Sequence, residues 1–235
     1  MKQANYEKHN KIQQLRPDEQ SIGLFCVENA RELGGIKSAN GKKVKPGRLI
    51  RSGQLSAAGK EDIMLLNDTL RVGVVVDLRS PGEAAGIPEP SGLRAQYLNL
   101  PLLDDPKQTY FFEDVPPEST TNLYYRIMFG GTAVKSYGKF FRLLLEYDEE
   151  RPVLFHSVRG RDRAGVASAL LLSLLGVPDE TIFAEYMLSK GVFAHTLGYI
   201  FSRANVEYGS VTEYVRAICG LSAGDITELK HKYLD

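Results

Sequence analysis

The chain has 235 residues, a length that fits one α/β domain with additions. Its 29 basic and 29 acidic residues give a formal net charge of zero, so no global basic field predicts binding to nucleic acid. No apolar stretch reaches the ~20 residues that span a bilayer, and residues 1–20 lack the apolar core of a signal peptide. We therefore expect a cytoplasmic or secreted protein without a membrane span. A chain from which a signal peptide had been removed would give the same prediction.

The cysteines and histidines give no sign of a disulfide framework or a metal site. Cys26 and Cys219 have apolar neighbours, so we expect both to be small buried hydrophobic residues. The histidines are scattered along the chain without the spacing of metal ligands, and we expect neither a metal nor another cofactor. They are His9, His156, His195 and His231.

The N-terminal part of the chain predicts an extension followed by the start of a domain. Residues 1–20 are polar, and we expect them to be an extension that precedes a single domain formed by residues 21–235. Within residues 27–36 the double glycine predicts a turn, and we expect Asn29 and Arg31 to tie this segment to the sheet. Residues 47–52 read as a strand that leads into a turn. Arg51 on that strand either faces a pocket or pairs with an acid.

The middle of the chain predicts a helix and then a buried strand. Residues 56–67 have helical character, and residues 72–78 form a β-branched apolar run that is typical of a strand buried on both faces. That strand ends in Asp77 and Arg79, and Glu83 follows shortly after. An Asp and an Arg at the end of a buried strand are expected to form an ion pair that shapes a site.

Two acidic residues follow the next predicted strand, residues 97–102. General acid catalysis requires a carboxyl group within hydrogen-bond reach of the leaving oxygen. Asp104 and Asp105 are candidates for it, and the alternative is a solvated turn before Pro106. Residues 108–131 are rich in aromatic side chains and form either a lid over a pocket or helices packed on the core. Residues 134–147 have the spacing of an amphipathic helix.

Residues 152–166 carry the strongest functional signal. The apolar run 153–155 predicts a buried strand, and the apolar run 166–175 predicts a buried helix. The turn between them contains Gly160 and the arginines Arg159, Arg161 and Arg163. Loop amides, a helix N-terminus and an arginine fork all attract a phosphate group, so we expect an anion site here. The alternative is a βα turn that the arginines merely keep solvated.

The run from His156 to Arg163 resembles the phosphate-binding loop of protein tyrosine phosphatases, whose pattern is H-C-x-x-G-x-x-R. It is most similar to the bacterial branch of tyrosine and phosphoinositide phosphatases, in which the loop usually reads H-C-x-x-G-K-D-R-T-G. Further segments that match the family lie at residues 29–36, 47–55 and 77–83. The resemblance extends from about Asn29 to Leu234.

The resemblance implies an α/β fold with a mostly parallel central sheet that is flanked by helices on both faces. It places the nucleophile at position 157 and implies that His156, Asp77 and Arg79 support the loop. We favour Asp162 as the general acid, with Asp104 or Asp105 as the alternatives. The implied ligand is phosphate or a phosphorylated protein, small molecule or lipid headgroup, such as phosphotyrosine or a phosphoinositide. The residues assigned to phosphate binding are Val158, Arg159, Gly160, Arg161, Asp162 and Arg163.

Arg161 stands where the branch has lysine, which keeps the charge. Two departures from the family pattern matter more: Ser157 replaces the nucleophilic cysteine, and Ala164 replaces a threonine. A serine hydroxyl is a far weaker acid than a thiol in such a loop, so we expect phosphate binding with little or no turnover. The serine is either a substitution made to trap substrate or the residue that the gene encodes. We favour the first because most of the loop is kept, whereas Ala164 favours the second. The alternatives to a phosphatase are a natural pseudophosphatase and a scaffold without phosphate affinity.

Overall fold

The computed structural model describes residue 15 and residues 20–104, 117–147 and 150–235. Most of the expected N-terminal extension, Asp105, and the first part of the aromatic segment lie outside the described residues. Within the described ranges, no helix has both the length and the apolar character needed to cross a bilayer.

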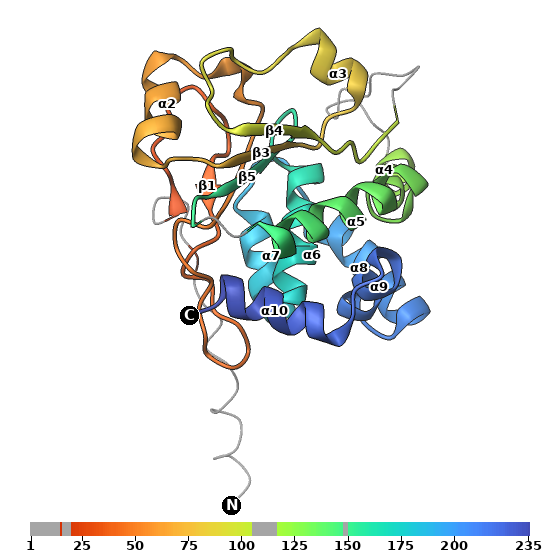
Figure 1. The fold of residues 1–235 in the computed structure, drawn as a ribbon. Coiled ribbons are helices and arrows are strands. Elements are labelled where there is room, and N and C mark those ends of the chain that lie inside the picture. Colours follow the sequence, from red (N-terminus) through yellow and green to blue (C-terminus); the bar gives the residue numbers. More distant parts are fainter. Residues whose placement is uncertain (1–14, 16–19, 105–116, 148–149) are drawn as a thin grey trace, which may run out of the picture.

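A mostly parallel sheet of five strands forms the centre of the described fold (Figure 1), as the resemblance predicts. The strand order is β1-β2-β5-β3-β4, in which only β1 runs antiparallel to its neighbour. The strands are β1 (Arg31–Glu32), β2 (Leu49–Ser52), β3 (Val74–Asp77), β4 (Gln96–Asn99) and β5 (Val153–His156).

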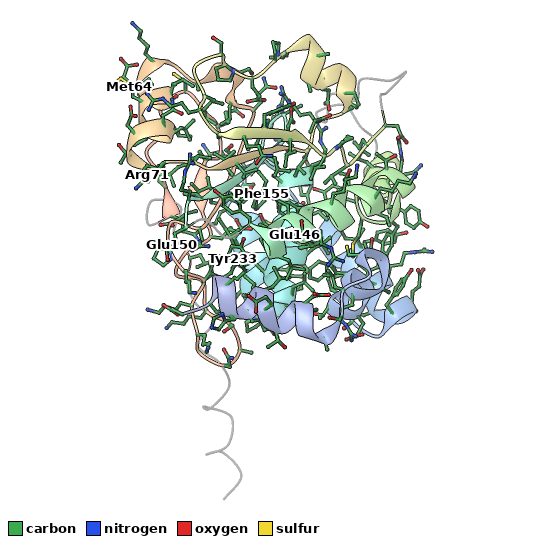
Figure 2. All side chains as sticks on the ribbon, in the orientation of Figure 1. Met64, Arg71, Glu146, Glu150, Phe155 and Tyr233 are labelled. Carbon is green, nitrogen blue, oxygen red and sulfur yellow. The ribbon has the colours of Figure 1, made fainter. Side chains whose placement is uncertain are left out.

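Alternate residues of the central strands supply two separate apolar layers. Leu154 faces a smaller cluster with Ile50, Val75 and Leu66, whereas Phe155 and its neighbours at alternate positions face the larger cluster. Phe155 accordingly lies at the centre of the molecule, and Met64 lies at its surface (Figure 2). This two-sided burial explains why the central strands are continuously apolar in sequence.

Helices cover both faces of the sheet. The face of the sheet that carries the smaller apolar cluster is covered by three elements: the turn η1 (Leu55–Ala57), the helix α2 (Lys60–Met64) and its π-helical continuation η2 (Leu65–Thr69). Many of the remaining helices lie together on the opposite face of the sheet (Figure 1). These other helices are α3 (Pro81–Gly86), α4 (Pro117–Phe129), α5 (Gly131–Glu146), α6 (Asp162–Leu174), α7 (Asp179–Met187), α8 (Ala194–Tyr208), α9 (Val211–Cys219) and α10 (Ala223–Tyr233).

Three local expectations need correction. The helix expected over residues 56–67 is interrupted, because Ala58 and Gly59 are extended between η1 and α2. The helix that contains the apolar run 166–175 begins at Asp162, so Arg163 lies in its first turn, as expected. Cys219, which we expect to be buried, is half-buried. Cys26 is exposed rather than buried, and both cysteines are free. The Cys26 segment is held at the surface because the buried Asp62 carboxylate accepts the amides of Phe25 and Cys26.

The carboxyl ends of four strands meet in one row across the sheet. The last residues of these strands are Ser52 in β2, Asp77 in β3, Asn99 in β4 and His156 in β5. The register aligns Ser52 with His156, His156 with Asp77, and Asp77 with Asn99. The chain turns out of the sheet immediately after each of them. Side chains and loops from distant parts of the sequence therefore gather at this edge, where open α/β sheets bind ligands.

Truncating a side chain in the smaller apolar layer is expected to destabilise the fold strongly. Leu154 is fully buried, so Leu154→Ala should lower the free energy of unfolding by about 2–5 kcal/mol through lost burial and an unfilled cavity. Urea denaturation measures this change. The control Val206→Ala removes methyl groups from a side chain that is 84% exposed, and it should shift stability by less than about 0.5 kcal/mol. Equal effects of the two substitutions would contradict the assignment of Leu154 to the core.

Candidate active site

The turn between β5 and α6 requires a glycine at position 160. Gly160 has a φ of +65°, and a Cβ atom there would lie 2.4 Å from the backbone carbonyl of Ser52. Both the positive φ and this close approach exclude a side chain. The loop is thus pressed directly against the end of β2.

Polar groups on the outside of the loop bind its carbonyl oxygens. The Gly160 carbonyl accepts hydrogen bonds from Asn29 Nδ2 at 2.8 Å and from Arg51 Nη2 at 2.7 Å. Arg51 Nη2 also donates to the Arg161 carbonyl at 3.1 Å, and the Gln54 amide donates to the Val158 carbonyl at 3.1 Å. We call Asn29, Arg51 and the groups that hold them the supporting shell. This shell holds the loop from behind by donating hydrogen bonds to its carbonyl oxygens.

This arrangement orients the loop amides. A planar trans peptide points its C=O and the following N–H in opposite directions. With the carbonyls of Gly160 and Arg161 turned towards Arg51, the N–H groups of Arg161 and Asp162 point away from the supporting shell. Amides oriented in this way at the start of a 13-residue helix are able to donate hydrogen bonds to an anion.

Arg51 is held in place by a buried carboxylate. Glu185 on α7 accepts Arg51 Nη1 at 2.7 Å and Arg31 Nε at 2.8 Å, and all three side chains are buried. Burial, together with the nearby charge of Arg31, lowers the pKa of Arg51 to about 10, and Glu185 opposes that shift. Of the two readings left open for Arg51, pairing with an acid is the one that the structure has.

Asn29 and Arg31 also tie the entry segment to this shell. Asn29 Nδ2 donates to Ser189 Oγ at 3.1 Å as well as to the loop, and Arg31 Nη2 donates to the same hydroxyl at 3.0 Å. Ser189, two residues after the end of α7, thereby connects the entry segment with the shell around the loop.

Arg163 on the first turn of α6 is fixed by Glu83 of α3. Its Nη1 and Nη2 lie 2.5 and 3.0 Å from the two carboxylate oxygens. A guanidinium has five N–H donors, so this pair leaves Nε–H and one hydrogen on each terminal nitrogen for a phosphate group. Burial alone would raise the pKa of Glu83, but its hydrogen bonds and charge interaction with Arg163, helped by Ser80, hold that pKa below the ordinary value.

His156, Asp77 and Arg79 form a buried polar cluster behind the loop. Arg79 Nη2 lies 2.8 Å from Asp77 Oδ2 and 2.5 Å from Glu89 Oε1, and His156 Nε2 lies 3.2 Å from Glu89 Oε1. Burial acts to raise the pKa of Asp77, but the hydrogen bonds of Arg79 and the charges of His156 and Arg79 hold it below its ordinary value. The expected Asp77–Arg79 ion pair is therefore present and is extended by Glu89.

This cluster brings together three groups of the kinds that bind metals, which the histidine spacing does not reveal. Ligand atoms of Asp77, Glu89 and His156 lie within 4.8 Å of one another. The Arg79 guanidinium, however, already binds both carboxylates and supplies the positive charge between them. The geometry within the described residues is therefore that of an ion-pair network.

The candidate general acids lie in different surroundings. Asp162 is the first residue of α6 and accepts a hydrogen bond from the Tyr124 hydroxyl, which is also hydrogen-bonded to the Tyr186 hydroxyl. Asp104 is exposed and accepts a hydrogen bond from Thr132 at the start of α5. Asp105 lies outside the described residues.

Sequence reasoning missed five residues of this site: Glu185, Glu89, Ser189, Tyr124 and Tyr186. No local motif marks them, because each is separated by many residues from the group that it binds. Charge balance is the signal that could have found Glu185, because two arginines expected at the sheet require a buried acid. Glu185 is the acid that lies within an otherwise apolar helical pattern.

Comparison with known proteins places these residues within a known family. A model described as the tyrosine phosphatase family matches residues 22–197, a range that includes every site residue described above. A protein of Cupriavidus necator, provisionally named a tyrosine-protein phosphatase, is 33% identical over 174 residues, covering 72% of this chain and 63% of the relative. The triple specificity protein phosphatase PtpB of Mycobacterium tuberculosis is 28% identical over 195 residues, covering 69% of this chain and 66% of the relative.

The chain thus spans slightly less than two thirds of the length of these two relatives. Among solved structures, the catalytic domain of the S. cerevisiae PP-IP phosphatase SIW14, in complex with citrate, aligns with a TM-score of 0.45 at 16% identity. That alignment covers 75% of this chain and 86% of the SIW14 domain.

Removing the Glu185 charge is expected to disrupt the supporting shell. Glu185→Gln leaves two buried guanidinium groups without a counter-charge, so the free energy of unfolding should fall by about 3–5 kcal/mol. Urea denaturation monitored by circular dichroism measures the change. In the control Glu213→Gln, the ion pair with Arg216 is lost at the surface, where the Glu213 side chain is 51% exposed and that of Arg216 is 35% exposed. This substitution should lower the free energy of unfolding by less than about 1 kcal/mol. If Glu185→Gln were no more harmful than this control, the shell would not depend on that carboxylate.

Proposed function

The chain belongs to the tyrosine phosphatase family, and from this premise we propose that its site hydrolyses phosphate monoesters when cysteine occupies position 157. With Ser157, the same site binds phosphate and leaves the ester intact. Two observations support the proposal: Arg51 binds the carbonyls of Gly160 and Arg161, which turns the following amides away from the supporting shell, and Glu83 binds only the two terminal nitrogens of Arg163.

The loop geometry supports a two-step displacement in the cysteine form. The thiolate attacks phosphorus, the S–P bond forms, and the bond from phosphorus to the ester oxygen breaks while Asp162 gives its proton to that oxygen. Water then attacks phosphorus, the S–P bond breaks, and the Asp162 carboxylate takes the proton of the water as inorganic phosphate forms. The amides and Arg163 bind the oxygens that carry negative charge in both steps.

Ser157 removes the nucleophile without removing the anion site. A serine requires a base to become nucleophilic, as in Ser–His arrangements. Neither ring nitrogen of the adjacent His156 makes a hydrogen bond within the described structure, so His156 is not paired with Ser157. The backbone donors and Arg163 do not depend on the side chain at position 157. Ser157 also supports the second candidate function, a natural pseudophosphatase that holds a phosphorylated ligand.

Positive charge around the loop favours a strongly anionic substrate. Arg159 and Arg161 are half-buried beside the loop, and Arg161 Nη1 donates to the Lys190 carbonyl at 3.3 Å. These charges suit phosphotyrosine in an acidic protein segment or a phosphoinositide headgroup. The name of the M. tuberculosis relative describes a phosphatase of triple specificity, which supports a substrate range wider than phosphotyrosine.

Restoring the thiol is the decisive test of the proposal. Ser157→Cys should hydrolyse 4-nitrophenyl phosphate at least about 1,000-fold faster than the serine form, because loss of a covalent nucleophile costs that much or more. The control Ser173→Cys places a thiol elsewhere on α6, where the native hydroxyl donates to a helix carbonyl, and it should stay silent. Activity is followed by release of nitrophenolate.

Binding of orthovanadate by the serine form, measured by calorimetry, separates the two candidate functions. Vanadate binding with an active Ser157→Cys variant supports the phosphatase. Vanadate binding with an inactive variant supports the pseudophosphatase. Absence of both binding and activity contradicts both functions and leaves the chain a scaffold.

Arg163 is expected to act through its planar shape as well as its charge. In the Ser157→Cys background, Arg163→Lys keeps the charge but cannot bind Glu83 and a phosphate with paired donors. Its kcat/KM should fall by about 100-fold or more, which is the usual cost of losing a donor to transition-state charge. Arg203→Lys, on an exposed ion pair with Glu207, provides the matched control and should leave kcat/KM unchanged. If Arg163→Lys left kcat/KM equal to that of the parent enzyme, the role assigned to the guanidinium would be wrong.

A further inference from the structure

Two buried tyrosines from separate helices converge on Asp162. Tyr124 of α4 is 1% exposed and Tyr186 of α7 is fully buried. The Tyr124 hydroxyl donates to Asp162 Oδ1, and the hydroxyls of Tyr124 and Tyr186 are hydrogen-bonded to each other. The chain Tyr186–Tyr124–Asp162 thus links α7 and α4 to the first residue of α6.

The position of Tyr186 is fixed by the backbone around it. A Cβ atom on Gly165 would lie 2.9 Å from the Tyr186 ring, so the ring packs directly against the α6 backbone at a glycine. The preceding residue, Glu185, is held by Arg31 and Arg51. Tyr186 is therefore a fixed point from which Tyr124 can be oriented.

Counting protons gives the direction of both hydrogen bonds. Burial first, and the nearby Asp162 charge second, raise the pKa of both phenols well above the ordinary value, so each keeps its single hydrogen. Tyr124 uses its hydrogen on Asp162 Oδ1, and Tyr186 must therefore donate to the Tyr124 oxygen. Oδ1 accepts this hydrogen bond, so Oδ2 is the oxygen of Asp162 that is left for the reacting groups.

We propose that Tyr124, oriented by Tyr186, is a positioning residue for proton transfer from Asp162. It fixes one carboxyl oxygen and leaves the other to deliver the proton to the leaving oxygen. Its hydrogen bond also strengthens as Asp162 becomes a carboxylate, so it stabilises the transition state more than the ground state. This inference rests on the proposed hydrolysis and on Asp162 as its acid.

The test compares two leaving groups in the Ser157→Cys background. Phenyl phosphate has a poor leaving group that needs protonation, whereas 4-nitrophenyl phosphate has a good one that needs it little. Tyr124→Phe should lower kcat/KM for phenyl phosphate, which reports the steps up to departure of the leaving group, by about 10- to 100-fold, the effect of one hydrogen bond to a charged group. It should change kcat/KM for 4-nitrophenyl phosphate by less than about 3-fold, because departure of that leaving group depends weakly on the acid.

Two further variants make the result specific. Asp162→Asn should show the same leaving-group pattern, and adding Tyr124→Phe to it should cause no further loss, because the two residues act through one proton. Tyr137→Phe is the matched control: Tyr137 is equally buried but donates to the Ile127 carbonyl at 3.1 Å, and its loss should not distinguish the two substrates. Vanadate affinity of the serine form should be unchanged by Tyr124→Phe, which checks that the loop is intact.

The outcomes separate this inference from the proposed function. If Ser157→Cys hydrolyses neither ester, hydrolysis itself is wrong and the inference falls with it. Suppose instead that Ser157→Cys is active but that Tyr124→Phe slows hydrolysis of both esters equally, or that its loss of activity adds to the loss caused by Asp162→Asn. Either result leaves the proposed hydrolysis in place and overturns the positioning role of Tyr124.

Discussion

The carboxylate of Glu185 binds two buried arginines, and the conformation of the loop between β5 and α6 depends on both of them. Arg51 reaches from Glu185 to the carbonyls of Gly160 and Arg161, while Arg31 connects Glu185 to Ser189. A buried guanidinium without a carboxylate would be costly, and a loop without bound carbonyls would not orient its amides. The shape of the site therefore originates in a helix that contributes no phosphate contact in the proposed mechanism.

The same pairing of guanidinium and carboxylate recurs around the site with a different result each time. Glu83 leaves part of Arg163 available to a ligand, whereas Asp77 and Glu89 bind Arg79 behind the loop. Glu185 is shared between two arginines. Pairing with Glu83 therefore still leaves Arg163 with N–H donors for a ligand.

The sequence predicted the parts of this structure that are encoded locally. The strand, loop and helix around residues 153–174 follow each other without interruption, so their apolar runs and their glycine were sufficient. The choice for Arg51 between a pocket and an acid could not be made, since Glu185 lies 134 residues away along the chain. Tyr124 was missed for the same reason, since it lies 38 residues from Asp162 along the chain. Cys26 was misjudged because apolar neighbours in sequence do not determine burial where one carboxylate holds the backbone at the surface.

The peptide planes of the loop are held by Asn29 and Arg51, which bind its carbonyl oxygens from behind. A ligand therefore does not have to organise its own donors, and little conformational entropy is lost when it binds. Recognition of the anion is in this sense separate from the chemistry at position 157. The scaffold around Gly160 could accept different side chains at that position and still present the same rigid receptor, so one fold could serve as a catalyst or as a reader of phosphorylation.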